Sequence, residues 1–133
     1  MVAMRQMPSA QDVALLVALN HRRKEEELGR ELPRLRMSKR ALRKISRRKK
    51  LDGRFIDNIN IELSELDRIL ISTGTVMGLI RLSSVEGWTR LNVERIVGEV
   101  ADIKAGRLNH VAVWEELAPE FADQEEDQED DDE

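Results

Sequence analysis

The residues best able to do chemistry in this sequence are cations between positions 34 and 54. This stretch holds eleven Lys or Arg against one acid, Asp52, in a chain whose net charge is −4. At the angular step of a helix, four of the cations fall on one side and the apolar residues on the other: Arg40, Arg43, Lys44 and Arg47. Guanidinium and ammonium groups in such a row suit the oxygens of a phosphate backbone.

Further cations continue the row beyond this predicted helix. The complete set predicted to contact phosphate is Arg40, Arg43, Lys44, Arg47, Arg48, Lys49 and Lys50. Two other interpretations stay open. The cations can form a solvated helix face, or they can meet an acidic protein partner or the acidic end of the chain itself.

The sequence offers little for catalysis or metal binding. It has no cysteine, which excludes disulfides, thiolate nucleophiles and Cys-based zinc sites. His21 and His110 stand alone, and neither belongs to a His-x-x-x-His spacing. The segment "STGTVMG" lacks the lysine of a phosphate-binding loop, and no Gly-x-Ser-x-Gly motif is present. We therefore expect no enzyme, no metal site and no cofactor.

Patterning predicts a mainly α-helical chain with a small β-hairpin and an extra C-terminal helix. The expected helices are 10–31, starting at a capping box of Ser9 and Asp12, then 38–48, 53–67 and 92–106. The expected strands are 33–37 and the two arms of a hairpin within 69–82. The segment "KKLDG" predicts a turn, in which Gly53 is able to take a positive φ.

Apolar spacing predicts which faces build the core. The positions expected to pack are Val13, Leu16, Val17 and Leu28 in the first helix, Ile56, Ile59, Leu63 and Leu66 in the third, Val93, Ile96, Val97, Val100 and Ile103 in the fourth, and Val111, Val113 and Trp114 near the C-terminus. A dimer seam on the first or fourth helix is the alternative interpretation of such stripes.

Composition predicts three segments: a flexible N-terminus at 1–9, one domain at 10–114 and an acidic, disordered tail at 115–133. The tail contains twelve acids and no base. It can serve solubility, occupy the basic patch of its own chain, or engage a basic partner. No apolar stretch approaches the roughly 18 residues of a membrane span, so we expect a cytoplasmic protein without membrane contact.

The order of helix, short strand, two helices and hairpin resembles the winged helix-turn-helix class of DNA-binding domains. The resemblance covers residues 10–82 and rests on element order, the turn "KKLDG" and the basic helix. It implies that residues 53–67 are a recognition helix for the major groove and that residues 69–82 are the wing.

The same resemblance implies two base-reading residues and one wing cation. Arg54 and Asn58 have the chemistry to pair with guanine and adenine, and Arg81 is the basic residue nearest to the wing. The third helix also carries Asp57, Glu62 and Glu65, which depart from the usual pattern because carboxylates repel phosphate.

These features predict a protein that binds double-stranded DNA, as a transcriptional regulator or as the DNA-binding accessory subunit of an assembly. We expect it to act as a homodimer. The alternative is a protein-protein interaction module, such as an antitoxin, inhibitor or assembly factor, whose acidic tail engages a basic partner.

Overall fold

The computed structural model of the chain describes residues 7–122, and these divide into two compact units. The first unit ends at Trp88 and the second begins at Thr89. This boundary lies inside the segment 10–114 that the sequence analysis treats as one domain.

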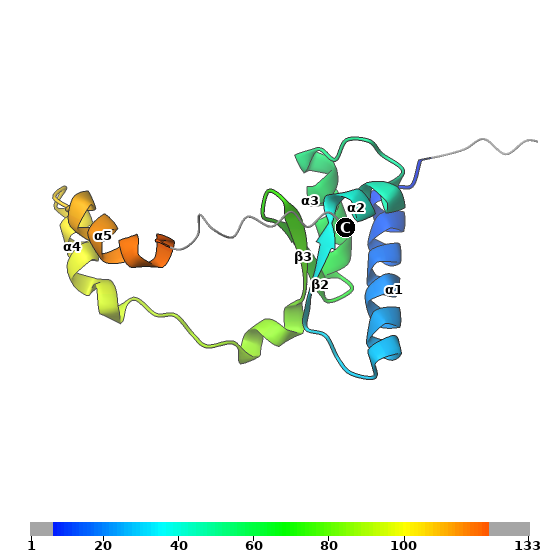
Figure 1. Ribbon diagram of the computed structural model, residues 1–133, viewed down its shortest axis with the longest axis horizontal. Coiled ribbons are helices and arrows are strands. Elements are labelled where there is room, and N and C mark those ends of the chain that lie inside the picture. Colours follow the sequence, from blue (N-terminus) through cyan, green and yellow to red (C-terminus); the bar gives the residue numbers. More distant parts are fainter. Residues whose placement is uncertain (1–6, 123–133) are drawn as a thin grey trace, which may run out of the picture. The chain divides into compact units, whose positions relative to one another are not determined.

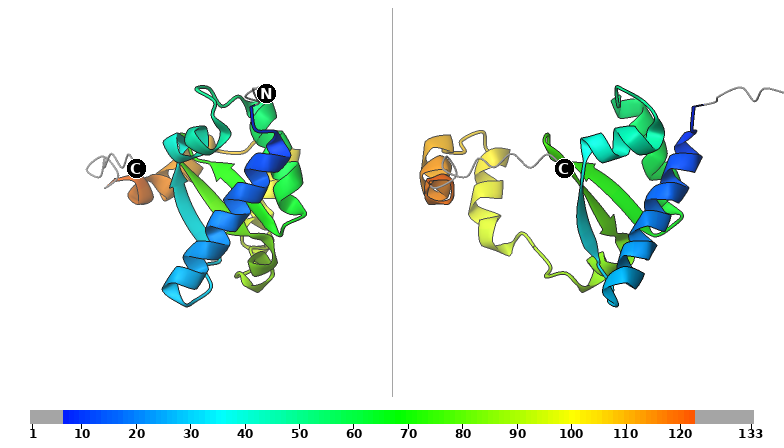
Figure 2. Two further views of the ribbon diagram at one scale, coloured as in Figure 1. Left: turned by 90° about the vertical axis from the view of Figure 1, so that its right-hand side faces the viewer. Right: turned by 45° about the vertical axis from the view of Figure 1, so that its right-hand side comes forward.

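The first unit consists of three helices and a three-stranded antiparallel sheet, followed by a 3₁₀ helix. Its elements are α1 (Ala10–Leu28), β1 (Arg34–Ser38), α2 (Lys39–Ser46), α3 (Gly53–Ser64), β2 (Arg68–Ser72), β3 (Val76–Arg81) and η1 (Leu82–Gly87). The strand order is β1-β3-β2, so β3 lies between the other two strands. Figures 1 and 2 show α1 and α3 on one side of this sheet, with α2 at the end of β1.

The ends of α1 follow from its capping residues. Ser9 and Asp12 form the predicted capping box, in which each side chain accepts from the backbone N–H of the other. The helix ends at Leu28, three residues earlier than predicted. Gly29 adopts the left-handed conformation at φ 70°, which stops the helix before Pro33 can influence it.

The basic helix and the turn after it differ from expectation in their backbone. Ser38 caps α2 as predicted, accepting from the N–H of Ala41. The helix ends at Ser46 because Arg47 takes the left-handed conformation, at φ 58°. Gly53 does not use the positive φ that glycine allows. Asp52 caps α3, and Gly53 is the first residue of that helix.

The sheet turns one face toward the helices. In the register of β1 with β3, Leu35 pairs with Leu79 and Met37 pairs with Met77, and these side chains pack into or against the core. The hairpin of β2 and β3 confirms the predicted pair of strands, and Gly74 at φ 99° forms its turn. The side chain of Asn60 in α3 bonds both the N–H and the C=O of Leu70, which fastens α3 to β2.

The core confirms the central part of the predicted α3 stripe. Ile59 and Leu63 are fully buried, and Ile56 packs at the edge of the same cluster. In α1 the buried apolar residues are Val13, Ala14 and Val17. The prediction that Leu16 and Leu28 face the core is wrong, because both are more than 40% exposed: 46% and 45%.

Near the C-terminal end of α1, the inward side of the helix carries polar side chains, and these form a buried hydrogen-bond network. His21 donates from Nε2 to the carbonyl oxygen of Leu32, at 2.8 Å, and its Nδ1 accepts from Nε of Arg68, at 2.8 Å. Glu25 accepts from the backbone N–H of Leu32 and, at 2.9 Å, from the guanidinium of Arg81. The network joins α1 to the start of β2 and the end of β3.

The regular elements in the described part of the second unit are all helices. Its elements are η2 (Glu94–Ile96), α4 (Val97–Lys104), α5 (His110–Leu117) and η3 (Ala118–Phe121). Asn92 accepts from the N–H of Glu94, but the α-helix predicted to start there begins only at Val97. Helical structure also extends through Phe121, into the predicted tail, while residues 123–133 lie outside the described part. The predicted packing is wrong for most positions of the fourth helix and of the C-terminal segment. The exposed fractions lie between 47% and 67% for Val93, Ile96, Val97, Ile103, Val111 and Trp114.

The predicted fold class is confirmed: the chain is mainly helical, with a small antiparallel sheet and extra helices at the C-terminal side. Within residues 7–122, no helix combines the length and the apolar character needed to cross a membrane.

The buried network predicts that stability falls as the pH drops below about 6.5. Burial lowers the pKa of His21 below its usual value of 6.5, so the unfolded chain takes up a proton that the folded chain resists. The free energy of unfolding is therefore fully retained above pH 6.5 and decreases between pH 6.5 and 5.5, by at most about 1 kcal/mol from this residue. Urea unfolding at pH 7.5 and 5.5 measures the change.

His21→Gln serves as the comparison, because glutamine is polar but does not titrate. The variant should be less stable at pH 7.5 and should depend less on pH between 7.5 and 5.5, while His110 remains in both proteins. An unchanged pH dependence in His21→Gln would show that the buried histidine is not its source.

Candidate nucleic-acid interface

A basic groove runs between α2 and the N-terminal end of α3. The residues that line it are Lys39, Arg43, Lys49, Lys50, Leu51, Gly53, Ile56, Asp57 and Ser72. Four of these are cations and one is a carboxylate, and the groove has a volume of about 470 Å³. We call this surface the basic groove. Cations lining a concave surface raise the local positive potential more than the same charges on a flat surface.

The hairpin turn lies at one end of the basic groove. Lys39 donates from Nζ to the carbonyl oxygen of Gly74 at 2.8 Å, and Ser72 at the end of β2 lines the groove. Lys39 is absent from the predicted set. The sequence indicates the helix cap at Ser38. It does not indicate that Lys39 lies close to Gly74, because the two residues are 35 positions apart.

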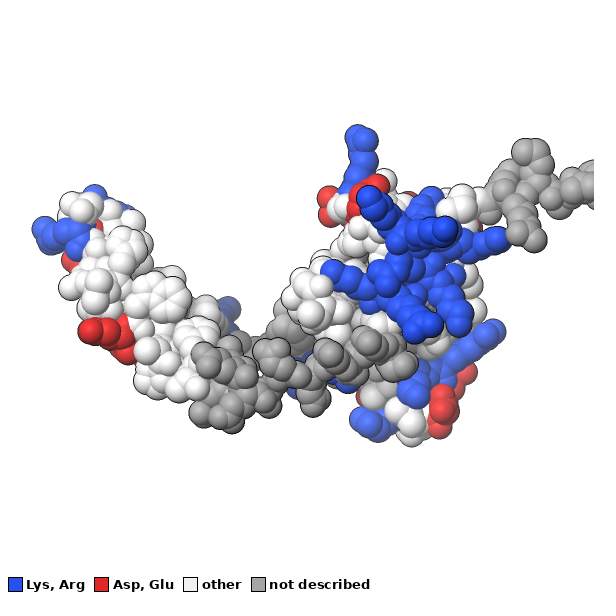
Figure 3. Space-filling view, turned by 45° about the horizontal axis from the view of Figure 1, so that its top comes forward, with Lys and Arg blue, Asp and Glu red and all other residues white. Residues whose placement is uncertain are grey.

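Three further predicted cations are exposed around the groove. Arg40 and Lys44 lie on α2, and Arg47 follows its last turn. Figure 3 shows Lys and Arg side chains gathered over one face of the first unit, with few acids among them. The structure thus brings together most of the cations that the sequence singled out.

Arg48 has a different environment from its neighbours. Its Nη1 donates to the carbonyl oxygen of Pro8 at 2.7 Å and to that of Ser46 at 3.3 Å. Its guanidinium carbon lies 3.8 Å from the centre of the Phe55 ring, in a cation–π arrangement. Arg48 therefore connects the N-terminal segment, the end of α2 and the start of α3, which is a structural role.

Arg81 is also engaged within the protein. It forms ion pairs with Glu25 at 2.9 Å and with Asp67 at 3.8 Å, and its side chain is 24% exposed. Burial acts to raise the pKa of Glu25, but the Leu32 N–H and the Arg81 guanidinium outweigh it and hold that pKa below its usual value. The carboxylate is thus ionised, and the wing cation predicted from the sequence has its charge matched inside the first unit.

The exposed side of α3 carries mixed charge. Arg54 and Asn58, the predicted base readers, are both exposed. Further along the same side of the helix, Ile61 is 61% exposed and is followed by the exposed carboxylate of Glu65. Asp57 lies on the wall of the basic groove. The cationic surface therefore continues onto α3 only at its N-terminal end, where Gly53 presents no side chain that could obstruct an approaching ligand.

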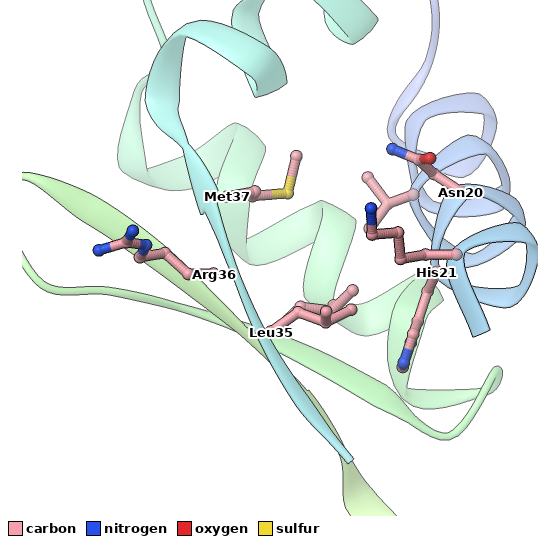
Figure 4. Close-up of a pocket in the computed structure, with 8 residues that line it drawn as sticks. Asn20, His21, Leu35, Arg36 and Met37 are labelled. Carbon is pink, nitrogen blue, oxygen red and sulfur yellow. The ribbon is translucent and has the colours of Figure 1, made fainter. Parts of the chain in front are cut away.

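A second cavity lies between α1 and β1 (Figure 4). It measures about 170 Å³ and has an apolar floor that includes Leu35 and Met37, while Arg36 points to the other side of the strand. Both ring nitrogens of His21 at its wall already have partners. The volume lies below the roughly 300–1,000 Å³ typical of sites for small molecules, so this cavity does not suggest a ligand.

The described residues contain no group of three or more His, Cys, Asp or Glu that could hold a metal ion. Comparisons with protein-family models, with curated proteins and with solved structures gave no match to the chain. The functional interpretation therefore depends on the charge and geometry of the first unit.

The position of Arg48 predicts a cost in stability when it is truncated. Arg48→Ala removes the contact with Phe55 and the hydrogen bond to Pro8, and should lower the free energy of unfolding by about 1–2 kcal/mol. Thermal unfolding followed by circular dichroism measures the loss. Lys44→Ala, at an exposed cation of the same helix, should change stability by less than about 0.5 kcal/mol. Equal effects of the two substitutions would contradict a structural role for Arg48.

Proposed function

We propose that this protein binds double-stranded DNA through the basic groove, as a regulator or as the DNA-binding subunit of an assembly. The observation that carries the proposal is the lining of that groove, in which four cations face one carboxylate beside the turn of a hairpin. The strand order β1-β3-β2 and the succession of α2 and α3 support a winged-helix arrangement, in which a hairpin flanks the bound duplex.

In this proposal the DNA backbone supplies most of the binding energy. Lys39, Arg43, Lys49 and Lys50 neutralise phosphates, with Arg40, Lys44 and Arg47 around them. Each neutralised phosphate releases condensed counterions, so about five contacts would give a slope of log affinity against log salt on the order of −4 to −5. Arg48 and Arg81 are left out of this set, because Arg48 stacks on Phe55 and bonds Pro8, and Arg81 is paired with carboxylates. Lys39 is kept, because its bond to Gly74 uses one of the three hydrogens that an ammonium group can donate.

Base reading is confined to the N-terminal part of α3. Arg54 and Asn58 can reach base edges, since both are exposed on the same side of the helix. Glu65, further along that side, disfavours deep insertion because a carboxylate near the phosphates lowers affinity. We propose shallow docking in which the start of α3 enters the major groove and the cations of the basic groove hold the backbone.

The acidic part of α3 favours a second candidate function. Ile61 is exposed next to Asn58, with Glu65 one turn further along, and an apolar residue flanked by polar groups suits a protein surface better than a nucleic acid. The alternative is a protein-protein interaction module that engages a basic partner through this face and the acidic C-terminal residues.

The basic groove predicts a specific response to salt and to substitution. Replacing Arg43, Lys49 and Lys50 by Ala should weaken binding to a duplex more than 10-fold at 50 mM salt and make the salt slope shallower by about 2 to 3. Fluorescence anisotropy titrations at 50 and 200 mM salt measure both quantities.

The matched control replaces Arg22, Arg23 and Lys24 by Ala, because it removes the same charge from exposed positions on α1. Its slope should change by less than about 1. Equal losses in the two triple variants would mean that net charge, and not the groove, drives binding. Absent or salt-insensitive binding by the wild-type protein would favour the protein-interaction module.

The C-terminal acids predict an autoinhibitory effect that depends on charge. Residues 123–133 contain nine acids, which compete with DNA for the basic groove at an effective concentration set by the connecting chain. A chain ending at Ala122, which leaves η3 intact, should bind duplex DNA more tightly at 50 mM salt, and the difference should shrink at 200 mM.

A full-length variant with Asn and Gln in place of these acids controls for chain length. It should behave like the shortened chain. If neither variant binds more tightly at low salt, the acidic residues do not compete for the groove.

A further inference from the structure

The second unit exposes an unusual amount of apolar surface for its size. None of the described residues from Thr89 to Ala122 is buried. Nine large apolar side chains are between 39% and 87% exposed: Leu91, Val93, Ile96, Val97, Ile103, Val111, Trp114, Leu117 and Phe121. We call this set the apolar face of the second unit.

Such a unit cannot be stable with its apolar face in water. The helices α4 and α5 have eight residues each, well below the roughly 12–15 at which an isolated helix becomes even marginally stable. Within the unit, the aromatic contact is that of Trp114 with Phe121, at 6.1 Å between ring centres. Ordering these residues needs burial against something outside the unit.

We propose that the apolar face binds the same set of side chains on a second copy of this chain, forming a symmetric dimer. A standard interface buries about 800 Å² on each partner, and large side chains such as Trp offer about 150–250 Å² each. Nine partly exposed apolar side chains supply an area of this order.

The chemistry of the face favours a copy over a different partner. The face must be covered whenever the unit is folded, and a second copy is present whenever the chain is. Dimers of identical chains have more apolar interfaces than transient complexes, and they most often form around a two-fold axis. The segment from Thr89 to Ala122 has four bases and six acids, so repulsion between two copies is small.

The first unit also exposes apolar side chains, but they are a weaker candidate for the dimer interface. Leu15 and Leu19 of α1 are half exposed in a shallow groove whose other walls include Arg22, Arg68 and Arg81. The first unit also has a core of its own, so scattered exposed leucines are ordinary there. The larger exposed apolar area therefore assigns dimer formation to the second unit.

Sedimentation equilibrium of the full chain tests the assignment. The wild-type protein should have about twice the mass of one 15.3 kDa chain at micromolar concentration. Val97→Asp combined with Val111→Asp places one carboxylate on each helix at sites that are 60% and 67% exposed, and should raise the dimer dissociation constant at least 100-fold. The matched control, Leu16→Asp with Leu28→Asp on α1, should remain a dimer.

Trp114 supplies an independent readout that does not require the aspartate variants. In a Trp88→Phe chain it is the single tryptophan, and its emission should shift to longer wavelength on dilution, in step with dissociation. A wild-type chain that is monomeric at about 100 µM would overturn the proposal. So would a dimer broken by the α1 control alone, or short-wavelength Trp114 emission that is independent of concentration, because its own chain would then cover the face.

This inference does not depend on the ligand of the basic groove. The Val97→Asp and Val111→Asp chain should keep the wild-type salt slope for DNA per chain, while the groove variant of Arg43, Lys49 and Lys50 should keep the dimer. The two proposals can therefore fail separately.

Discussion

Burial of Ile59 and Leu63 is the constraint on which the rest of the first unit depends. These two side chains hold α3 in the same cluster as Val13 and Val17 of α1, and they occupy the side of α3 that would otherwise be available to a ligand. With that side of α3 buried, the start of the helix contributes Gly53, Ile56 and Asp57 to the basic groove. Lys39 and Arg43 of α2 and Lys49 and Lys50 of the following loop supply its cations.

Polar contacts then fix what apolar packing leaves free. Asn60 bonds both backbone groups of Leu70, and His21 with Arg68 joins α1 to the same strand. These bonds have defined directions, which dispersion contacts lack, so they select one placement of the hairpin against the helices. Lys39 completes the arrangement at the other end of the hairpin by bonding the carbonyl of Gly74. A small core thus supports a surface that spans several elements.

The sequence predicted those features that depend on neighbouring residues. The capping box of Ser9 and Asp12, the cap at Ser38 and the buried positions Ile59 and Leu63 all follow from spacing along one helix. Predictions from the sequence were wrong where contacts between residues far apart in the chain determine which side chains are buried. Leu16 was predicted to be buried, but the angular position of α1 against α3 turns His21 inward and leaves Leu16 in water. The same limitation explains why Lys39 is absent from the predicted set. It also explains why the sequence does not indicate the contact of Arg48 with the Phe55 ring or the ion pair of Arg81 with Glu25.

The backbone at Arg47 shows a conflict between local stability and charge. A residue with a Cβ atom at φ 58° carries a strain of roughly 1 kcal/mol that glycine would not have. Glycine at position 47 would remove this strain at the end of α2. It would also remove a cation next to the basic groove and raise the conformational entropy of the unfolded chain. An engineer seeking a more stable version of this protein would find an apparent gain at this residue and would lose positive potential with it. Position 47 is thus a place where optimising the fold and optimising the surface require opposite substitutions.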